Sequence, residues 1–210
     1  MKKELNSIYK KLYSFFGPQY WWPADEPFEV MVGAILTQNT NWQNVERAIG
    51  NLKKNKSLSP GKMYKMPEKK LGQFIRPSGY YNIKAKRLKA FLKFFTEECG
   101  ADFRRMAKAD TAILRRQLLS VNGIGPETAD SMLLYALNKP VFVVDAYTKR
   151  ILSRHSLIKE GFDYQEVQNL FMQNLKNEVK LFNEYHALLV KLGKDICLKN
   201  KPRCNLCPLK

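Results

Sequence analysis

Residues 118–150, LLSVNGIGPETADSMLLYALNKPVFVVDAYTKR, decide the fold. Their first half has the form of a helix, a Gly-Ile-Gly turn and a second helix. Asp110 is placed to cap the first helix, and Gly123 and Gly125 permit backbone angles that other residues avoid. Pro126 suits the first position of the second helix, where its missing N–H costs nothing. The stretch therefore predicts a helical hairpin.

This hairpin is a candidate phosphate clamp. Asn122, Gly123, Ile124 and Gly125 come directly before a helix start, where unpaired backbone N–H groups point the same way and attract an anion. The alternative is an ordinary turn between two helices, because a lone Gly-x-Gly is a weak motif.

The second half of the stretch ends in an aspartate. Lys139-Pro140 stops the helix, residues 141–144 form a short apolar run, and Asp145 follows directly. The simplest interpretation of Asp145 is an N-cap of the next helix. A carboxylate beside a phosphate-binding hairpin would also lie near nucleic acid, where a negative charge is costly unless it has a function. One residue can fill both roles.

Composition indicates a polyanionic partner. The chain has 210 residues, a net charge of +17 and a pI near 9.7, so nucleic acid is the leading candidate. No apolar run is long enough to span a membrane, and residues 1–4 lead into a polar helix rather than a signal peptide. We expect a monomeric, cytoplasmic protein of a prokaryote, associated with the nucleoid.

Helical periodicity runs through the whole chain. We expect helices over residues 4–16, 27–38 and 42–53, and two more over 163–181 and 184–198, the first of them capped by Asp163 with Glu166. The helix at 27–38 is apolar nearly all round, which is typical of a buried central helix. Because no alternating strand pattern is found, the predicted fold class is all-α.

Two loops carry aromatic side chains. Tyr80, in a Gly-Tyr-Tyr-Asn loop, precedes a run of cations without acidic residues that includes Lys84, Lys86 and Arg87. Such a run is usually a solvated helix face, but with this net charge we expect it to contact a nucleic-acid backbone. The other loop contains Trp21, Trp22 and Pro23, and one of its tryptophans either anchors the loop or lines a pocket with the other.

Histidine and cysteine differ in what their spacing suggests. His155 and His186 have no partner at metal-ligand or catalytic spacing, so we interpret each as structural or surface. Cys197, Cys204 and Cys207 cluster at the end of an intracellular-looking chain, which favours a metal over a disulfide.

These features together resemble the helix-hairpin-helix DNA glycosylase superfamily, whose best-known member is endonuclease III. The resemblance covers nearly the whole chain. It rests on five motifs in the family's order: the Leu36-Thr37-Gln38-Asn39 turn, the Gly79-Tyr80-Tyr81-Asn82 loop with Lys84-Ala85, the hairpin at 121–125, Val143-Val144-Asp145, and the C-terminal cysteines.

The resemblance implies two lobes, with damaged double-stranded DNA bound in the cleft between them. One lobe is a six-helix barrel domain at 27–139, with the helix-hairpin-helix at about 112–137. The other combines 1–26 with 140–210 and ends in the Cys-rich loop. By the same resemblance the hairpin amides grip a phosphate, Asp145 is essential for catalysis, Gln38 fills the gap in the base stack, and Tyr80 wedges into the duplex.

Glu127 decides the subclass. Bifunctional members have a lysine at this position, which forms a Schiff base with the sugar, and a carboxylate cannot form an imine. We therefore expect base excision repair by hydrolysis with water, without strand cleavage. Asp145 would stabilise the oxocarbenium-like sugar and orient or deprotonate the water.

The base pocket suggests the substrate. It resembles the pocket of 3-methyladenine DNA glycosylases of endonuclease III type, on residues Trp21, Trp22, Pro23, Trp42, Lys194 and Glu127. Electron-rich rings attract cationic alkylated purines. For Lys194 a phosphate contact is the alternative. Two other functions stay open: a glycosylase for T/G or U/G mismatches or oxidised bases, and a damaged-DNA-binding module without catalysis.

The cysteines match the family only in part. Cys197, Cys204 and Cys207 resemble the start of a four-cysteine 4Fe–4S loop, whose fourth ligand would follow six residues after Cys207, beyond Lys210. We expect the cluster in a full-length protein. The alternatives are a vestigial site, another ligand, or zinc.

Overall fold

The computed structural model describes residues 1–21 and 26–210, and every regular element in these ranges is a helix. The chain divides into two compact units. Unit 1 combines Met1–Pro23 with Pro140–Lys210, and unit 2 is Ala24–Lys139. No helix in the described part of the chain is long and apolar enough to cross a membrane.

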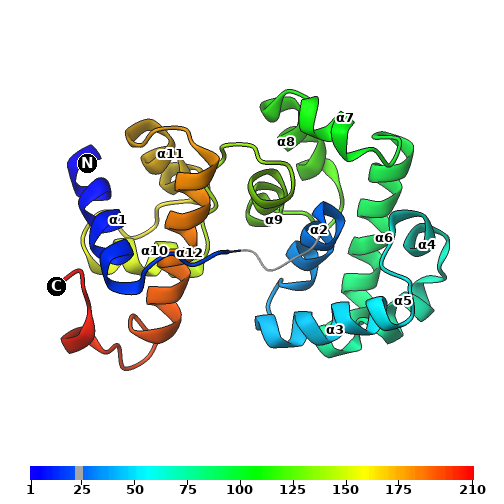
Figure 1. The fold of residues 1–210 in the computed structure, drawn as a ribbon, viewed down its shortest axis with the longest axis horizontal. Coiled ribbons are helices and arrows are strands. Elements are labelled where there is room, and N and C mark those ends of the chain that lie inside the picture. The colour runs from blue at the N-terminus through cyan, green and yellow to red at the C-terminus, as the bar shows by residue number, and fades with distance from the viewer. Residues whose placement is uncertain (22–25) are drawn as a thin grey trace. The chain divides into compact units, whose positions relative to one another are not determined.

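Unit 2 is built around α2 (Pro27–Leu36), in which every residue from Phe28 onward is buried. The all-round apolar sequence requires this, and the predicted buried central helix is confirmed. Figure 1 shows α2 among α3, α6 and α9. The other elements are α3 (Trp42–Lys54), α4 (Pro60–Lys65), α5 (Glu68–Phe74), the 3₁₀ turn η1 (Arg76–Ser78), α6 (Tyr81–Glu97), α7 (Phe103–Lys108), α8 (Thr111–Ser120), α9 (Pro126–Ser131) and the π-helical turn η2 (Met132–Ala136).

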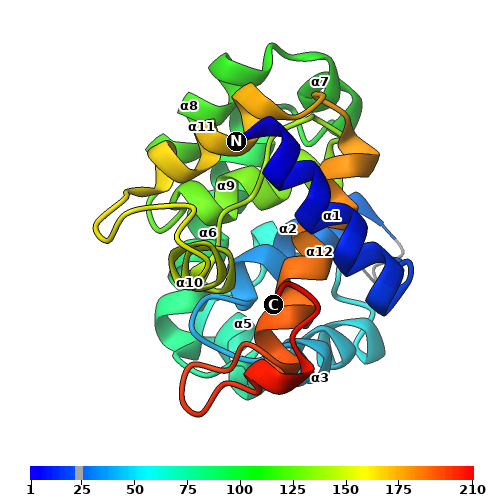
Figure 2. The same ribbon diagram turned by 90° about the vertical axis from the view of Figure 1, so that its left-hand side faces the viewer.

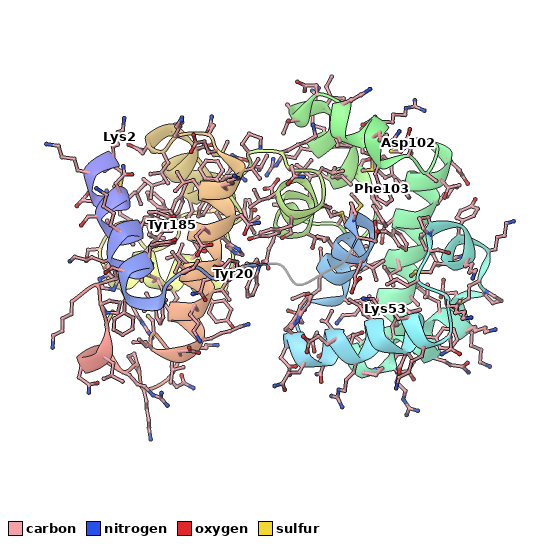
Figure 3. The ribbon with its side chains drawn as sticks, in the orientation of Figure 1. Lys2, Tyr20, Lys53, Asp102, Phe103 and Tyr185 are labelled. Carbon is pink, nitrogen blue, oxygen red and sulfur yellow. The ribbon has the colours of Figure 1, made fainter. Side chains whose placement is uncertain are left out.

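Unit 1 is built around α12 (Val179–Asp195), which packs against α10 (Ala146–Arg154) and α1 (Lys2–Phe16). Figure 2 shows α1 alongside α12. Tyr185 of α12, labelled in Figure 3, is fully buried and donates its hydroxyl proton to the carbonyl of Leu5 at 2.9 Å. The remaining elements of the unit are α11 (Tyr164–Asn174) and the 3₁₀ turn η3 (Cys204–Leu206).

The helix starts within and on either side of residues 118–150 are confirmed. Asp110 caps α8 by accepting a hydrogen bond from the Ile113 amide, and Pro126 is the first residue of α9. Asp163 and Glu166 form the expected reciprocal capping box at the start of α11.

One predicted helix is wrong in its extent. The helix expected over 163–181 ends at Asn174, and the next begins at Val179 rather than Glu184. Leu175 takes an extended backbone (φ −116°, ψ 163°) and buries its side chain, so the chain turns where periodicity alone suggested continuation.

Candidate active site and nucleic-acid interface

Asp145 lies at the N-cap of α10. Its Oδ1 accepts a hydrogen bond from the Thr148 amide at 2.7 Å, and its Oδ2 lies 3.6 Å from Nε2 of His186. The side chain is only 10% exposed. Burial raises the pKa of Asp145, but the His186 imidazole and the Thr148 amide outweigh it, so the pKa stays below its usual value. The result is a carboxylate held ionised.

The residues before Asp145 fix its position. Val141–Val144 are buried, and the Phe142 ring stacks on Phe171 with centroids 3.7 Å apart. The side-chain amide of Gln168 donates to the Phe142 carbonyl at 2.7 Å. An extended segment needs partners for its backbone groups, and this buried segment finds one on α11. Asp145 therefore follows a buried, hydrogen-bonded segment rather than a free loop.

Close packing of α10 on α12 also depends on a glycine. A Cβ on Gly193 would lie 2.4 Å from Cδ1 of Tyr147, so only glycine fits there. The guanidinium of Arg150 covers the Tyr147 ring at 5.0 Å and donates to the carbonyls of Gly193 and Cys197.

The hairpin of unit 2 is braced from both helices. Arg115 of α8 donates two hydrogen bonds, at 2.7 and 3.0 Å, to the fully buried carboxylate of Asp130 on α9. Within the described structure the N–H groups of Gly123 and Gly125 have no hydrogen-bond partner. Two backbone amides of the turn are therefore open, and their binding of a phosphate stays a prediction.

Ile124 has a different place from its neighbours in the hairpin. Its side chain is 4% exposed and its amide donates to the Val121 carbonyl at 3.0 Å. The expectation that Ile124 contacts DNA is therefore corrected: it anchors the hairpin to the core. Asn122 is exposed and remains a candidate contact.

Gln38 and Arg87 connect the hairpin to the rest of unit 2. The Gln38 amide donates to the Gly123 carbonyl at 3.0 Å and to Oγ1 of Thr128 at 2.9 Å, while Nη1 of Arg87 donates to Oε1 of Gln38. The Arg87 side chain lies against Gly123, where an added Cβ would come within 2.2 Å of it. Sequence reasoning placed Gln38 and Arg87 at the interface but did not foresee that they contact each other.

Tyr80 lies at the exposed tip of its loop. Its side chain is 69% exposed and its backbone is left-handed (φ 45°, ψ 33°), which is uncommon for a bulky residue. Strain of this kind concentrates at functional sites.

Lys84 does not join the exposed cations. It is 1% exposed, and its ammonium donates to the carbonyls of Leu36 and Ser78 at 2.8 and 2.7 Å. Burial, with the nearby Arg87 charge, lowers the pKa of Lys84 to about 8. The predicted DNA contact of Lys84 is therefore corrected: it ties the end of α2 to the segment before Tyr80. Lys86 is exposed, as a phosphate contact requires.

The predicted pocket residues fall in both units. In unit 1 the ammonium of the exposed Lys194 lies 5.4 Å from the centroid of the Trp21 ring. In unit 2 the indole of Trp42 donates to Glu46 at 2.7 Å, and Glu127 is exposed in the first turn of α9. Trp22 and Pro23 lie outside the described residues.

The three C-terminal cysteines are not gathered. Cys197 is buried and its sulfur accepts a hydrogen bond from Arg154 at 3.4 Å, whereas Cys204 is exposed. Among the described residues, no group of three or more His, Cys, Asp or Glu side chains could hold a metal ion. As arranged here, the thiols do not fit the expected cluster.

Comparison with known proteins places this geometry in a family. The profile of the HhH-GPD superfamily of base excision DNA repair proteins matches residues 32–177. The chain is 53% identical over 205 residues to MJ1434 of Methanocaldococcus jannaschii, provisionally named a DNA repair glycosylase, with 97% of this chain and 92% of the relative covered.

Solved structures agree with this match. The H. pylori 3-methyladenine DNA glycosylase MagIII, bound to 1,N6-ethenoadenine, is 32% identical with a TM-score of 0.75, over 92% of this chain and 95% of that one. An endonuclease III–DNA complex has the same fold at 20% identity, with a TM-score of 0.85 over 100% of this chain and 93% of that one. The chain therefore belongs to the HhH-GPD superfamily and is a DNA glycosylase of base excision repair.

Proposed function

We propose that the protein hydrolyses the N-glycosidic bond of alkylated purines such as 3-methyladenine in double-stranded DNA. The Asp145 carboxylate carries the proposal, because it is buried yet held ionised by Thr148 and His186. A fixed negative charge stabilises the positive charge that develops on the sugar as the base departs. The same carboxylate can orient or deprotonate the attacking water.

Glu127 supports simple base removal. Glu127 is exposed, and by the resemblance to bifunctional members it occupies the position of their lysine. No imine with the sugar can form through a carboxylate. The abasic strand would therefore be left intact.

The aromatic residues support an alkylated purine. The Trp21 ring is electron-rich and already attracts one cation, since the Lys194 ammonium lies 5.4 Å from its centroid. A cationic base would use the same attraction, on the other face of the ring or after the ammonium moves away. Alkylated purines with a positive charge also leave without a general acid. The 32% identity to a 3-methyladenine glycosylase structure points the same way.

A duplex panel tests the proposal. Four duplexes with 3-methyladenine, 7-methylguanine, thymine opposite guanine, or an oxidised pyrimidine are incubated with the protein, and each product is divided and analysed with and without alkali. Release of alkylated purines, with strand breaks only after alkali, is the expected result. Release of mismatched thymine alone would replace the proposal with the mismatch function, and breaks without alkali would contradict the absence of lyase activity.

The iron–sulfur expectation rests on the resemblance alone. A 4Fe–4S cluster needs a fourth thiolate beside Cys197, Cys204 and Cys207, and it needs all of them brought together. Anaerobic reconstitution of the protein with iron and sulfide tests this expectation. Visible absorption from a bound cluster would support it, and no such absorption would contradict it.

A further inference from the structure

His186 is a buried polar residue of unit 1 with apolar residues around it in the sequence. It is 6% exposed, on the stretch of α12 from Tyr185 to Val190 that is buried throughout. Burying an imidazole costs free energy unless a polar partner offsets it. Its neighbour Tyr185 bonds the Leu5 carbonyl, whereas His186 faces the carboxylate of Asp145.

With this contact, each carboxylate oxygen of Asp145 has a partner in the protein. Thr148, on the same helix, holds Oδ1 at 2.7 Å, and His186, from a different helix, lies 3.6 Å from Oδ2. The Phe142 ring lies beside the imidazole and perpendicular to it, with centroids 6.5 Å apart. Each carboxylate oxygen keeps a lone pair for the sugar or the water, in a direction that these partners fix.

A separation of 3.6 Å is longer than a hydrogen bond. Catalytic hydrogen bonds are often long in the free enzyme and shorten in the reacting complex. Nε2 is the nitrogen that faces the carboxylate, so a proton on Nε2 would point at Oδ2.

We propose that His186 is a positioning residue for base release, which holds the Asp145 carboxylate in the orientation that the reaction needs. The inference rests on the proposed role of Asp145 as the catalytic carboxylate. His186 acts through Asp145 and does not itself touch the substrate.

The test compares His186→Leu, His186→Gln and His155→Leu. Leucine fills the space without a polar atom, whereas glutamine places an amide N–H near the position of Nε2. His155, half-buried at the end of α10, is the matched control in the same unit. Rates of base release are measured in single turnover with saturating protein, together with affinity for duplex DNA and thermal unfolding.

We expect His186→Leu to slow base release by roughly 100-fold, as a misplaced reacting group does, while DNA affinity stays unchanged. His186→Gln should recover most of the rate, and His155→Leu should match the wild type. Wild-type rates in His186→Leu, or equal losses in the leucine and glutamine variants, would overturn the inference.

A second measurement needs no substrate. In protein with ¹³C-labelled aspartate, the pKa of the Asp145 carboxyl should rise in His186→Leu relative to the wild type. An unchanged Asp145 pKa would also overturn the inference. If wild-type protein released no base from any duplex, the proposed function would fail, and this titration would still decide whether His186 holds the carboxylate.

Discussion

The starts of α9 and α10 differ in whether a side chain of the protein caps their backbone amides. At α9 the N-cap is Gly125, no side chain of the described structure caps the helix, and the Gly123 and Gly125 amides stay open. At α10 the chain supplies its own anion, because Asp145 caps the helix through Thr148. An open helix start can take a phosphate from outside, and a closed one holds a charge in place. We therefore expect the start of α9 to contribute to DNA binding and the start of α10 to contribute to the reaction.

The largest expected effect comes from removing the charge of Asp145 at the capped start of α10. Asp145→Asn keeps an oxygen for the Thr148 amide, so the helix remains capped, but it cannot stabilise the sugar cation. We expect base release to fall by about 10³-fold with duplex binding retained. Single-turnover release and fluorescence anisotropy measure the two properties. An unchanged rate would favour a different catalytic group, and wild-type protein without any base release would favour a DNA-binding module.

The second-largest effect should come from a substitution in the hairpin before α9, whose start has no side-chain cap among the described residues. Gly123→Ala places a Cβ at φ 85° and within 2.2 Å of Arg87, so both backbone and neighbour must move. We expect a loss of roughly 1–3 kcal/mol in the free energy of unfolding, from strain of this kind. Duplex affinity should fall too, because the hairpin amides shift.

Gly125→Ala is the matched control for this change. Its φ is −90° and no atom lies within 4 Å of an added Cβ, so stability should hardly change. Equal destabilisation by both alanines in urea unfolding would contradict this account of the hairpin.

Removing the cap of a helix that carries no catalytic residue should change stability alone. Asp110 caps α8 through the Ile113 amide at 2.9 Å and is exposed. Asp110→Ala should cost about 1 kcal/mol in the free energy of unfolding and leave the single-turnover rate unchanged. A fall in rate comparable to that of Asp145→Asn would erase the distinction between a structural and a catalytic cap.

The smallest effect should be that of a single exposed cation. Lys86→Ala should weaken binding a few-fold and lower the slope of log K against log salt by about 1, if Lys86 meets a phosphate. Lys93→Ala is the control on the same helix, since Lys93 already lies 4.0 Å from the Glu97 carboxylate. Equal slopes for Lys86→Ala and wild type would remove Lys86 from the interface.

Local rules predicted the helix starts but not the contacts between distant residues. The caps at Asp110, Asp145 and Asp163 act over three residues, so the sequence was enough to place them. His186 was interpreted as structural or surface because its partner is far away in the sequence, and only packing of α12 against α10 brings the two together.

The buried cation was missed for another physical reason. Lys84 belongs to a run of cations that was predicted to contact a nucleic-acid backbone, yet its long side chain reaches two backbone carbonyls inside unit 2. Ends of helices leave carbonyls without partners, and a lysine can bond them. The order of charged residues in the sequence does not show where those carbonyls lie. It therefore cannot distinguish the buried Lys84 from the exposed Lys86.

Gly193 allows α10 and α12 to lie close enough for Asp145 and His186 to meet. It lies two helical turns beyond His186 on α12, and Tyr147, which it accommodates, lies two residues beyond Asp145 on α10. Any side chain at this position acts as a wedge between the two helices and widens the gap between imidazole and carboxylate. We therefore expect a methyl group at position 193 to slow base release through its contact with Tyr147, and a screen for inactive variants should find Gly193 alongside the charged residues.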